Sequence, residues 1–342
     1  MFVTGCHRSG TSLLASLLHA AFGFDLSPNK PHLKAQIDNP RGFFESKRIV
    51  KLNDELLSLL GAEWHRPPLL APEWSSQSFI STFAPWRSGL ADYALSTRWI
   101  DKDPRLCITY PAYLHLLLKR VPLAAVIRHP LAVAGSLFAR DGMPLEQGLA
   151  LWYVYNYHLA ASLQEGDLLL AYEQLLTLGD ASTSSAISEA INGFAERQGH
   201  QVATSADFQS RIHQLICRHL NRAPSSLPRS LLSQVNSSLL SICQESYDLA
   251  CSQGLPDVQS HRLAFDVLPR PVLMALPQPG TVHLSNFQLA LHENQQLKAE
   301  LELSHRHSQD CQAQLALIQS SAAWRVSYSL RYLKDRLTSF FH

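Results

Sequence analysis

The chain has almost no excess of either charge. Its 342 residues include 29 Lys and Arg and 28 Asp and Glu, which gives a formal net charge of +1. This balance argues against a general nucleic-acid binder, so an anion site must be a local cluster of basic side chains. Long apolar runs are missing too: none approaches the roughly 18 residues that cross a bilayer. No signal peptide precedes Gly5, and we therefore expect a cytoplasmic protein.

Paired cysteines are also missing. The six cysteines form no C-x-x-C pair and no metal-ligand spacing, so we expect reduced, structural thiols and no metal centre; they are Cys6, Cys107, Cys217, Cys243, Cys251 and Cys311. Hydrophobic residues, in contrast, make up 46% of the chain, which is enough for a core and excludes global disorder. The length suits one large domain with an appendage, or two domains.

The most informative stretch is residues 2–18, FVTGCHRSGTSLLASLL. A short apolar strand leads into a glycine-bounded turn, and leucines three and four apart then predict a helix. Backbone N–H groups of such a turn and the helix dipole form a cradle for phosphate. The alternative is a glycine turn before an ordinary helix. The expected ligand-binding residues are Gly5, Cys6, His7, Arg8, Ser9, Gly10, Thr11 and Ser12.

The spacing of this loop is that of a Walker A motif with one substitution. Thr11 stands where the NTPase lysine belongs, and Arg8 supplies the fixed charge instead. Such a loop is a poor NTPase site, but it suits a 5′-phosphate or a phosphosulfate.

Strands and helices alternate along the first half of the chain. Strands are predicted over 98–100, 123–127 and 167–172, and helices over 47–60, 79–96, 113–119, 131–139 and 145–163. This order predicts a three-layer, P-loop-type α/β domain with a central parallel sheet, which binds ligands at the carboxyl ends of its strands.

We divide the chain into a P-loop domain over 1–260, a proline-rich linker over 261–283 and a helical tail over 284–342. Residues 284–319 lack proline and glycine and carry spaced leucines, which favours a self-associating helix or coiled coil and hence a homo-oligomer. The basic, aromatic segment 324–334 is amphipathic. It either lies on a membrane surface, such as the inner membrane, docks on a partner, or packs back on the domain.

Other charged residues follow the predicted strands. Lys102 lies in an Asp-Lys-Asp turn, Arg128 ends a strand with Ser136 eight residues later, and Tyr172 precedes Glu173. An arginine and a hydroxyl so placed could hold a second phosphate. The alternatives are a solvated turn lysine, a strand-end salt bridge and a tyrosine that packs in the core instead of stacking on a base.

Together, and in this order, these motifs resemble the PAPS-dependent sulfotransferases, nearer the bacterial, tyrosylprotein and carbohydrate branches than the cytosolic phenol branch. PAPS is 3′-phosphoadenosine 5′-phosphosulfate, and PAP is its desulfated product. The resemblance covers residues 1–180 and implies that the loop holds the phosphosulfate, that Arg128 and Ser136 hold the 3′-phosphate, and that Lys102 contacts the sulfuryl group. Tyr172-Glu173-Gln174-Leu175 resembles the family's Y-E-D-L segment.

The chain departs from the family pattern in two respects. His129 replaces a frequent aspartate, and no late R-K-G segment is present, which leaves Arg140 as a further candidate for the 3′-phosphate. The resemblance implies sulfuryl transfer to a hydroxyl of a carbohydrate or small metabolite, with no metal and with Arg8 and Lys102 stabilising charge.

Glu45 is the predicted general base, although a glutamate in the first turn of a helix explains it almost as well. His32 and His65 are reserve candidates. The acceptor pocket is expected from residues 27–41 and 64–86 and the helices after Gly142. Sugar rings would stack on tryptophans there, unless these serve packing: Trp64, Trp74, Trp86 and Trp152.

Two other functions compete with this interpretation. A P-loop nucleotide kinase or NTPase would need a Walker B aspartate, for which Asp101 is the nearest approach. A degenerate P-loop scaffold in polysaccharide assembly would keep the fold and lose the chemistry.

Overall fold

The computed structural model describes residues 1–27, 44–69, 72–95, 99–178, 184–200, 235–251 and 254–276, with residues 212, 214–216, 232–233, 309 and 312. Contacts divide the chain into two units, Met1–Val282 and His283–His342. His32 and almost all of the tail over 284–342 lie outside the described residues. Self-association of 284–319 and surface contact by 324–334 therefore stay predictions.

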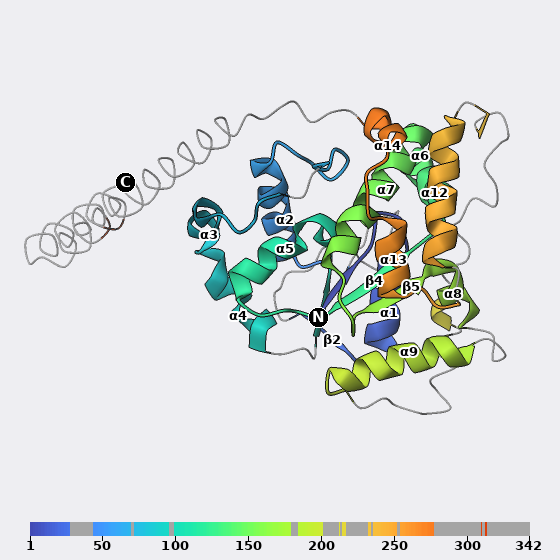
Figure 1. Ribbon diagram of the computed structural model, residues 1–342. Helices are drawn as coiled ribbons and strands as arrows, with labels where there is room; N and C mark the ends of the chain where they lie inside the picture. Colours follow the sequence, from blue (N-terminus) through green and yellow to red (C-terminus); the bar gives the residue numbers. More distant parts are fainter. Residues whose placement is uncertain are drawn as a thin grey trace, which may run out of the picture. The chain divides into compact units, whose positions relative to one another are not determined.

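A five-stranded sheet forms the centre of the first unit (Figure 1). Its strands pair in the order β2-β3-β1-β4-β5, and every pair is parallel. The strands are β1 (Phe2–Thr4), β2 (Asp25–Leu26), β3 (Trp99–Lys102), β4 (Leu123–Ile127) and β5 (Leu168–Ala171). The predicted α/β class is confirmed, and β2 is a strand that the sequence did not reveal. Since later strands lie on both sides of β1, a ligand crevice is expected at its carboxyl end.

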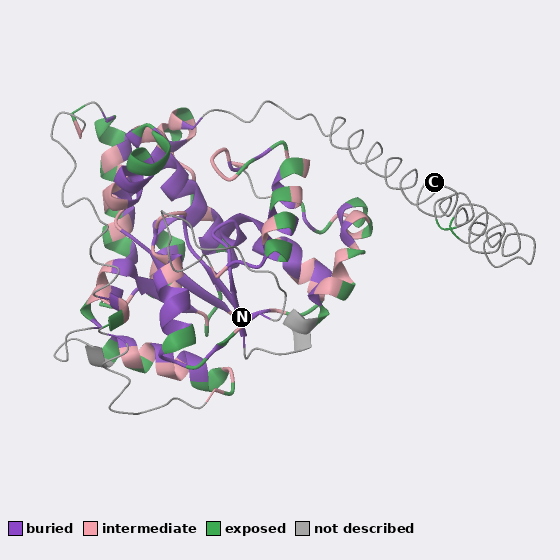
Figure 2. Cartoon of the chain, turned by 180° about the vertical axis from the view of Figure 1, so that it is seen from behind, coloured by how far each residue is buried: buried purple, intermediate pink, exposed green. Residues whose placement is uncertain are grey.

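The two faces of the sheet belong to two separate cores, and the central strands are buried (Figure 2). Along β4, Leu123, Ala125 and Ile127 face one core, whereas Ala124 and Val126 face the other. This alternation is the side-chain period of a strand. Strands that are buried on both faces read as continuous apolar runs, which is why β4 was recognisable.

Helices cover both faces. The first core contains side chains of α2 (Lys47–Leu59), α3 (Gln77–Phe83), α4 (Trp86–Leu95), α5 (Leu106–Leu117), α6 (Pro130–Asp141), α7 (Leu145–Ser162), α12 (Ser237–Ala250), α13 (Val258–Ala264) and α14 (Arg270–Ala275). The second contains side chains of α1 (Thr11–Ala20), α8 (Tyr172–Thr177) and α9 (Ser184–Arg197). Pro130 occupies the first turn of α6, as predicted, because a missing N–H costs nothing there.

Two helix predictions differ from the structure. The helix predicted over 79–96 is two helices, α3 and α4, with Pro85 between them; proline lacks the N–H that a continuous helix needs. Helix α5 starts at Leu106, well before the predicted residue 113, and contains Pro111. Leu106, Cys107 and Tyr110 are fully buried, so packing stabilises the turns before the proline.

The first part of the predicted linker is folded. Residues 261–276 include the end of α13 and all of α14, and Phe265, Val272 and Leu276 are buried in the first core. Two of the prolines that suggested a linker stand at the start of α14: Pro269 is its N-cap residue, and Pro271 lies in its first turn.

Candidate active site

The loop after β1 has the backbone of an anion cradle. Gly5, Arg8 and Gly10 have φ values of +148°, +67° and +95°. A Cβ on Gly5 would lie 2.3 Å from the Val126 carbonyl oxygen, so only glycine fits at this point. The Ser9 N–H donates to the Cys6 carbonyl at 3.1 Å, and the N-cap residue of α1 is Gly10, which has no side chain to cap the helix. The loop therefore presents the positive end of a helix dipole at the predicted crevice.

Tyr172 fixes the far side of this loop. A Cβ on Gly10 would lie 2.2 Å from the Cδ2 atom of Tyr172, and the guanidinium carbon of Arg128 lies 4.3 Å from the centre of its ring. The tyrosine is 9% exposed. Tyr172 packs in the second core, which is one of the two roles that the sequence allowed for it. Because its ring contacts both Gly10 and Arg128, it holds Arg128 beside the loop.

Arg8, Arg128 and Ser136 form one cluster. Arg128 Nη1 donates to the Arg8 carbonyl at 2.9 Å, and Arg8 Nε donates to Ser136 Oγ at 2.9 Å. Ser136, eight residues after Arg128, thus lies in the same cluster as Arg128. Its hydroxyl accepts a hydrogen bond from Arg8. Arg128 Nε is buried and has no hydrogen-bond partner among the described residues. A buried donor of this kind is costly unless a ligand pairs with it.

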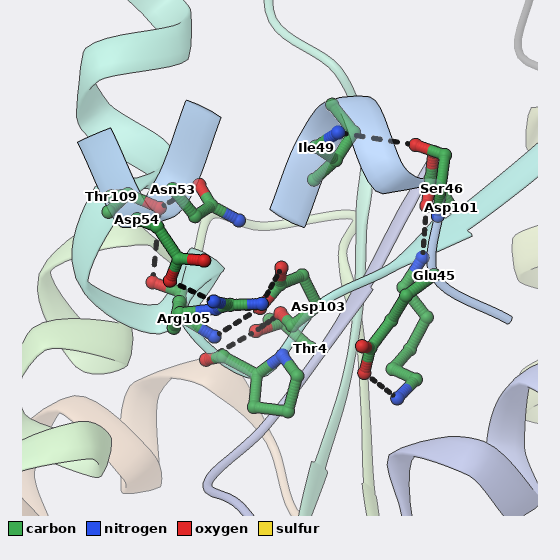
Figure 3. A network of polar contacts seen from close by, with 12 residues as sticks. Thr4, Glu45, Ser46, Ile49, Asn53, Asp54, Asp101, Asp103, Arg105 and Thr109 are labelled. Atoms are coloured by element: carbon green, nitrogen blue, oxygen red, sulfur yellow. Dashed lines mark hydrogen bonds and ion pairs between the residues drawn. The ribbon is translucent and has the colours of Figure 1, made fainter. Parts of the chain in front are cut away.

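Lys102, the last residue of β3, forms an ion pair with Glu45, which precedes α2 (Figure 3). Both are buried, and Val3 of β1 pairs with Lys102 in the sheet. Burial raises the pKa of the Glu45 carboxyl, as does the nearby Asp103, whereas Lys102 opposes the shift. Lys102 is therefore not the solvated turn lysine that the sequence allowed.

Asp101 organises the backbone behind this pair. Its Oδ1 atom accepts the N–H groups of Ser46 and Lys102, each at 3.0 Å, and the residue is fully buried (Figure 3). A Walker B aspartate needs a carboxylate that faces the ligand through a metal, whereas this carboxylate holds backbone amides together. Its position therefore favours a structural role.

The sequence missed the role of Arg105. Both carboxylate oxygens of Asp103 accept from its guanidinium, at 2.9 and 2.8 Å, and Asp54 accepts as well (Figure 3). These carboxylates raise the pKa of Arg105 against the effect of burial. Thr4 Oγ1 donates to the Asp103 carbonyl at 3.1 Å, which ties the K-D-P-R turn to β1. The arginine directly after K-D-P was the available signal.

A second unpredicted contact reaches the site from α12. The Tyr247 hydroxyl donates to Glu173 Oε2 at 2.8 Å, and Glu173 Oε1 accepts the N–H of His129 at 3.1 Å. The rings of His129 and Tyr247 lie 5.2 Å apart. No local motif marks Tyr247. Arg140, the further candidate for the 3′-phosphate, bonds to Asp141 and lies 5.5 Å from the ring centre of Trp64.

The tryptophans differ in their surroundings. Trp152 is fully buried and donates to the Arg128 carbonyl at 2.9 Å, so it cannot take a sugar ring. Trp74 is buried against Phe79, and Trp86 donates to Glu55. Trp64 packs on His7 and lines a cavity of about 430 Å³. His65, a reserve base, lies 3.4 Å from Glu63.

Two features bear on metal binding and on membrane insertion. Among the described residues, no group of three or more His, Cys, Asp or Glu side chains could hold a metal ion. In the same part of the chain, none of the helices has the length and apolar character needed to cross a bilayer.

No family model and no curated protein matches the chain. Two solved structures resemble it weakly. The sulfotransferase domain of the Synechococcus PCC 7002 olefin synthase is 15% identical, with a TM-score of 0.33 and coverage of 80% of this chain and 92% of that one. The sulfotransferase domain from the curacin biosynthetic pathway is 14% identical, with a TM-score of 0.31 and coverage of 68% and 95%. Similarity at this level carries no functional inference.

Proposed function

We propose that this protein is a sulfotransferase that moves the sulfuryl group of PAPS to a hydroxyl of a carbohydrate or small metabolite. One observation carries the proposal. A Walker-like loop without the NTPase lysine lies at the N-terminus of α1, whose N-cap residue is a glycine, and three basic residues lie at or after the ends of β1, β3 and β4: Arg8, Lys102 and Arg128.

The residues of this site suit a donor with two anionic ends. The loop amides and Arg8 would hold the 5′-phosphosulfate, and Arg128 would hold the 3′-phosphate. Two buried polar atoms support this assignment, because Arg128 Nε and Ser9 Oγ have no hydrogen-bond partner in the described part of the chain. Anionic oxygens are the acceptors that such donors lack.

PAPS would supply an activated sulfuryl group whose transfer spreads charge over peripheral oxygens, as in phosphoryl transfer. The chain would stabilise that charge with Arg8 and Lys102, which lie beside the helix N-terminus. Glu45 keeps Lys102 in place through their ion pair. A sulfuryl group carries less charge than a phosphoryl group, so fixed cations of the protein suffice in this proposal.

A nucleotide kinase or NTPase is less well supported. Thr11 replaces the lysine that would bind β- and γ-phosphates, and the nearest Walker B candidate, Asp101, holds backbone amides. The scaffold hypothesis differs in predicting that no donor binds at all.

The proposal is tested by adding PAP to the purified protein without magnesium and measuring its melting temperature and binding heat. We expect PAP to stabilise the wild type. Arg128→Ala should weaken PAP binding by about 10- to 150-fold, because charge-assisted hydrogen bonds contribute about 1.5–3 kcal/mol. Arg270→Ala, which removes an exposed arginine of α14, is the matched control.

Two results would contradict the proposal. The first is stabilisation by Mg-ATP and not by PAP, which would favour the kinase. The second is no binding of either nucleotide, which would favour the scaffold. Transfer of labelled sulfate from PAPS to a panel of glycans and phenols then identifies the acceptor class.

A further inference from the structure

The cavity of about 430 Å³ lies where α2 ends and the chain turns into residues 61–64. The sequence predicted no role for this end of α2. The lining residues that are exposed or partly exposed, and so accessible to a ligand, are Asp54, Ser58, Gly61, Glu63 and Trp64. A volume of this size suits one small ligand, and the lining offers it hydrogen-bond partners beside an aromatic wall.

Two of these lining residues connect the cavity to the candidate active site. The ring of Trp64 lies 4.7 Å from that of His7, in the loop after β1. Asp54 forms an ion pair with Arg105, which follows the K-D-P turn at the end of β3 (Figure 3). The cavity thus adjoins residues from the carboxyl ends of two strands, where a parallel sheet binds its ligands. A small molecule in the cavity would be a neighbour of the phosphate loop.

The segment that carries Trp64 is fastened to the helices behind it. The Tyr155 hydroxyl, from α7, donates to the Trp64 carbonyl at 2.8 Å. One turn later on α7, His158 Nε2 donates to the Pro68 carbonyl at 2.6 Å. The guanidinium carbon of Arg140, from α6, lies 5.5 Å from the centre of the Trp64 ring. Trp64 is therefore held in place before a ligand binds, which reduces the entropy that binding costs.

The cavity wall carries an excess of negative charge. Arg105 pairs with both Asp54 and Asp103. Arg66 Nη2 lies 3.0 Å from Glu63 Oε1, so three carboxylates share two guanidinium groups. The side chains of Asp54 and Glu63 are 59% and 53% exposed, and a carboxylate has about four acceptor positions, so both can accept further hydrogen bonds. Among the described lining residues there is no lysine or arginine that could bind an anion.

We propose that this cavity binds the acceptor and selects an uncharged, polyhydroxylated ring, such as a sugar, over an anionic one; this inference rests on the proposed sulfotransferase function. Hydroxyl groups of the ring donate to Asp54 and Glu63, because a carboxylate is a strong acceptor for them. The C–H groups of the ring pack against the exposed part of Trp64. An acceptor that carries its own carboxylate or sulfate meets the negative charge of the wall, which disfavours its binding.

The test compares methyl β-glucoside with methyl β-glucuronide, which share one ring and differ in a carboxylate. Protein labelled with 5-fluorotryptophan and saturated with PAP is titrated with each probe, and the fluorine signal of Trp64 is assigned by its loss in Trp64→Phe. We expect the glucoside to shift this signal and to leave that of Trp74, which is buried against Phe79, in place. The glucuronide should bind at least about 5-fold more weakly, because one like-charge contact at about 4 Å has this effect even in water.

A double variant tests whether the two carboxylates cause the selectivity. Asp54→Asn combined with Glu63→Gln removes their charge and keeps the shape of the cavity. In this variant the preference for the glucoside over the glucuronide should disappear. Glu55→Gln is the matched control, because Glu55 is the next carboxylate on α2, pairs with Lys51 and is not among the described lining residues. It should keep the preference of the wild type.

Three results would overturn the inference. The first is that neither probe shifts the Trp64 signal, and the second is that the glucuronide binds as well as the glucoside; both are read from the wild type and do not depend on the folding of a variant. The third is an unchanged preference in the double variant. PAP binding is measured beside each titration. If PAP binds, these results leave the proposed sulfotransferase function in place, whereas failure of the wild type to bind PAP overturns that function and this inference with it.

Discussion

Substitution of Gly10 by alanine gives a quantitative test of how the phosphate loop is held. The new methyl carbon would lie 2.2 Å from Cδ2 of Tyr172, whereas carbon atoms in contact lie at least about 3.5 Å apart. The ring must therefore retreat by about 1.3 Å, and overpacking of this kind costs about 1–3 kcal/mol. The φ of +95° adds about 1–2 kcal/mol for any residue with a Cβ.

A second glycine separates the two contributions. Gly142, which caps α6, has a φ of +68°, and a Cβ added there would meet no atom within 4 Å. Gly142→Ala should therefore reduce the free energy of unfolding by the backbone cost alone, about 1–2 kcal/mol. Gly10→Ala should reduce it by about 2–5 kcal/mol, because the steric cost at Tyr172 is added.

Urea unfolding of both variants measures the difference, and Gly10→Ala combined with Tyr172→Ala tests its cause. If the ring is responsible, the double variant loses less stability than the sum of the two single variants. Equal destabilisation by Gly10→Ala and Gly142→Ala would refute the reasoning, because it would leave no energetic role for the contact between the loop and Tyr172.

Two further predictions concern buried charge. Asp103→Ala should reduce the free energy of unfolding by about 3–5 kcal/mol, because it removes the buried carboxylate that pairs with Arg105. Asp54 also pairs with Arg105, but its side chain is 59% exposed, so Asp54→Ala should cost at most about 1 kcal/mol. Similar losses in urea unfolding would contradict this. Burial lowers the pKa of His158 to about 4, whereas the same histidine in the unfolded chain binds its proton near pH 6.5. Between these two values only the unfolded state is protonated, so the free energy of unfolding falls by up to about 1.4 kcal/mol for each unit by which the pH drops. His158→Gln should remove this one-proton slope from urea unfolding measured across that range; an unchanged slope would rule out His158 as its source.

The sequence predicted those parts of the fold that local patterns determine. Leucine periodicity marked α1, the apolar run 123–127 marked β4, and Pro130 marked the start of α6. Each signal lies within one element, because side-chain period and capping depend only on near neighbours. Helix α5 was missed in part because burial of Leu106 and Tyr110 outweighs the break that Pro111 suggests.

The candidate site was predictable as a set of residues and not as a set of contacts. The order of motifs drew attention to Arg8, Lys102 and Arg128. That Arg8 bonds to Ser136, or that Glu45 pairs with Lys102, depends on how distant strands align. Such pairing follows from the whole sheet, which no local window of sequence contains.

The contact between Tyr247 and Glu173 has a consequence for where the protein can be divided. Every motif residue lies before residue 180, yet α12 supports the turn at His129 and also packs on α7, where Cys243 Sγ contacts the Leu149 carbonyl at 3.7 Å. A fragment that ends at residue 180 would contain all the motif residues. It would lose α12, whose Tyr247 contacts Glu173 and so supports the turn at His129. Expression boundaries and chimeras should therefore follow the end of α14 and not the end of the recognisable motifs.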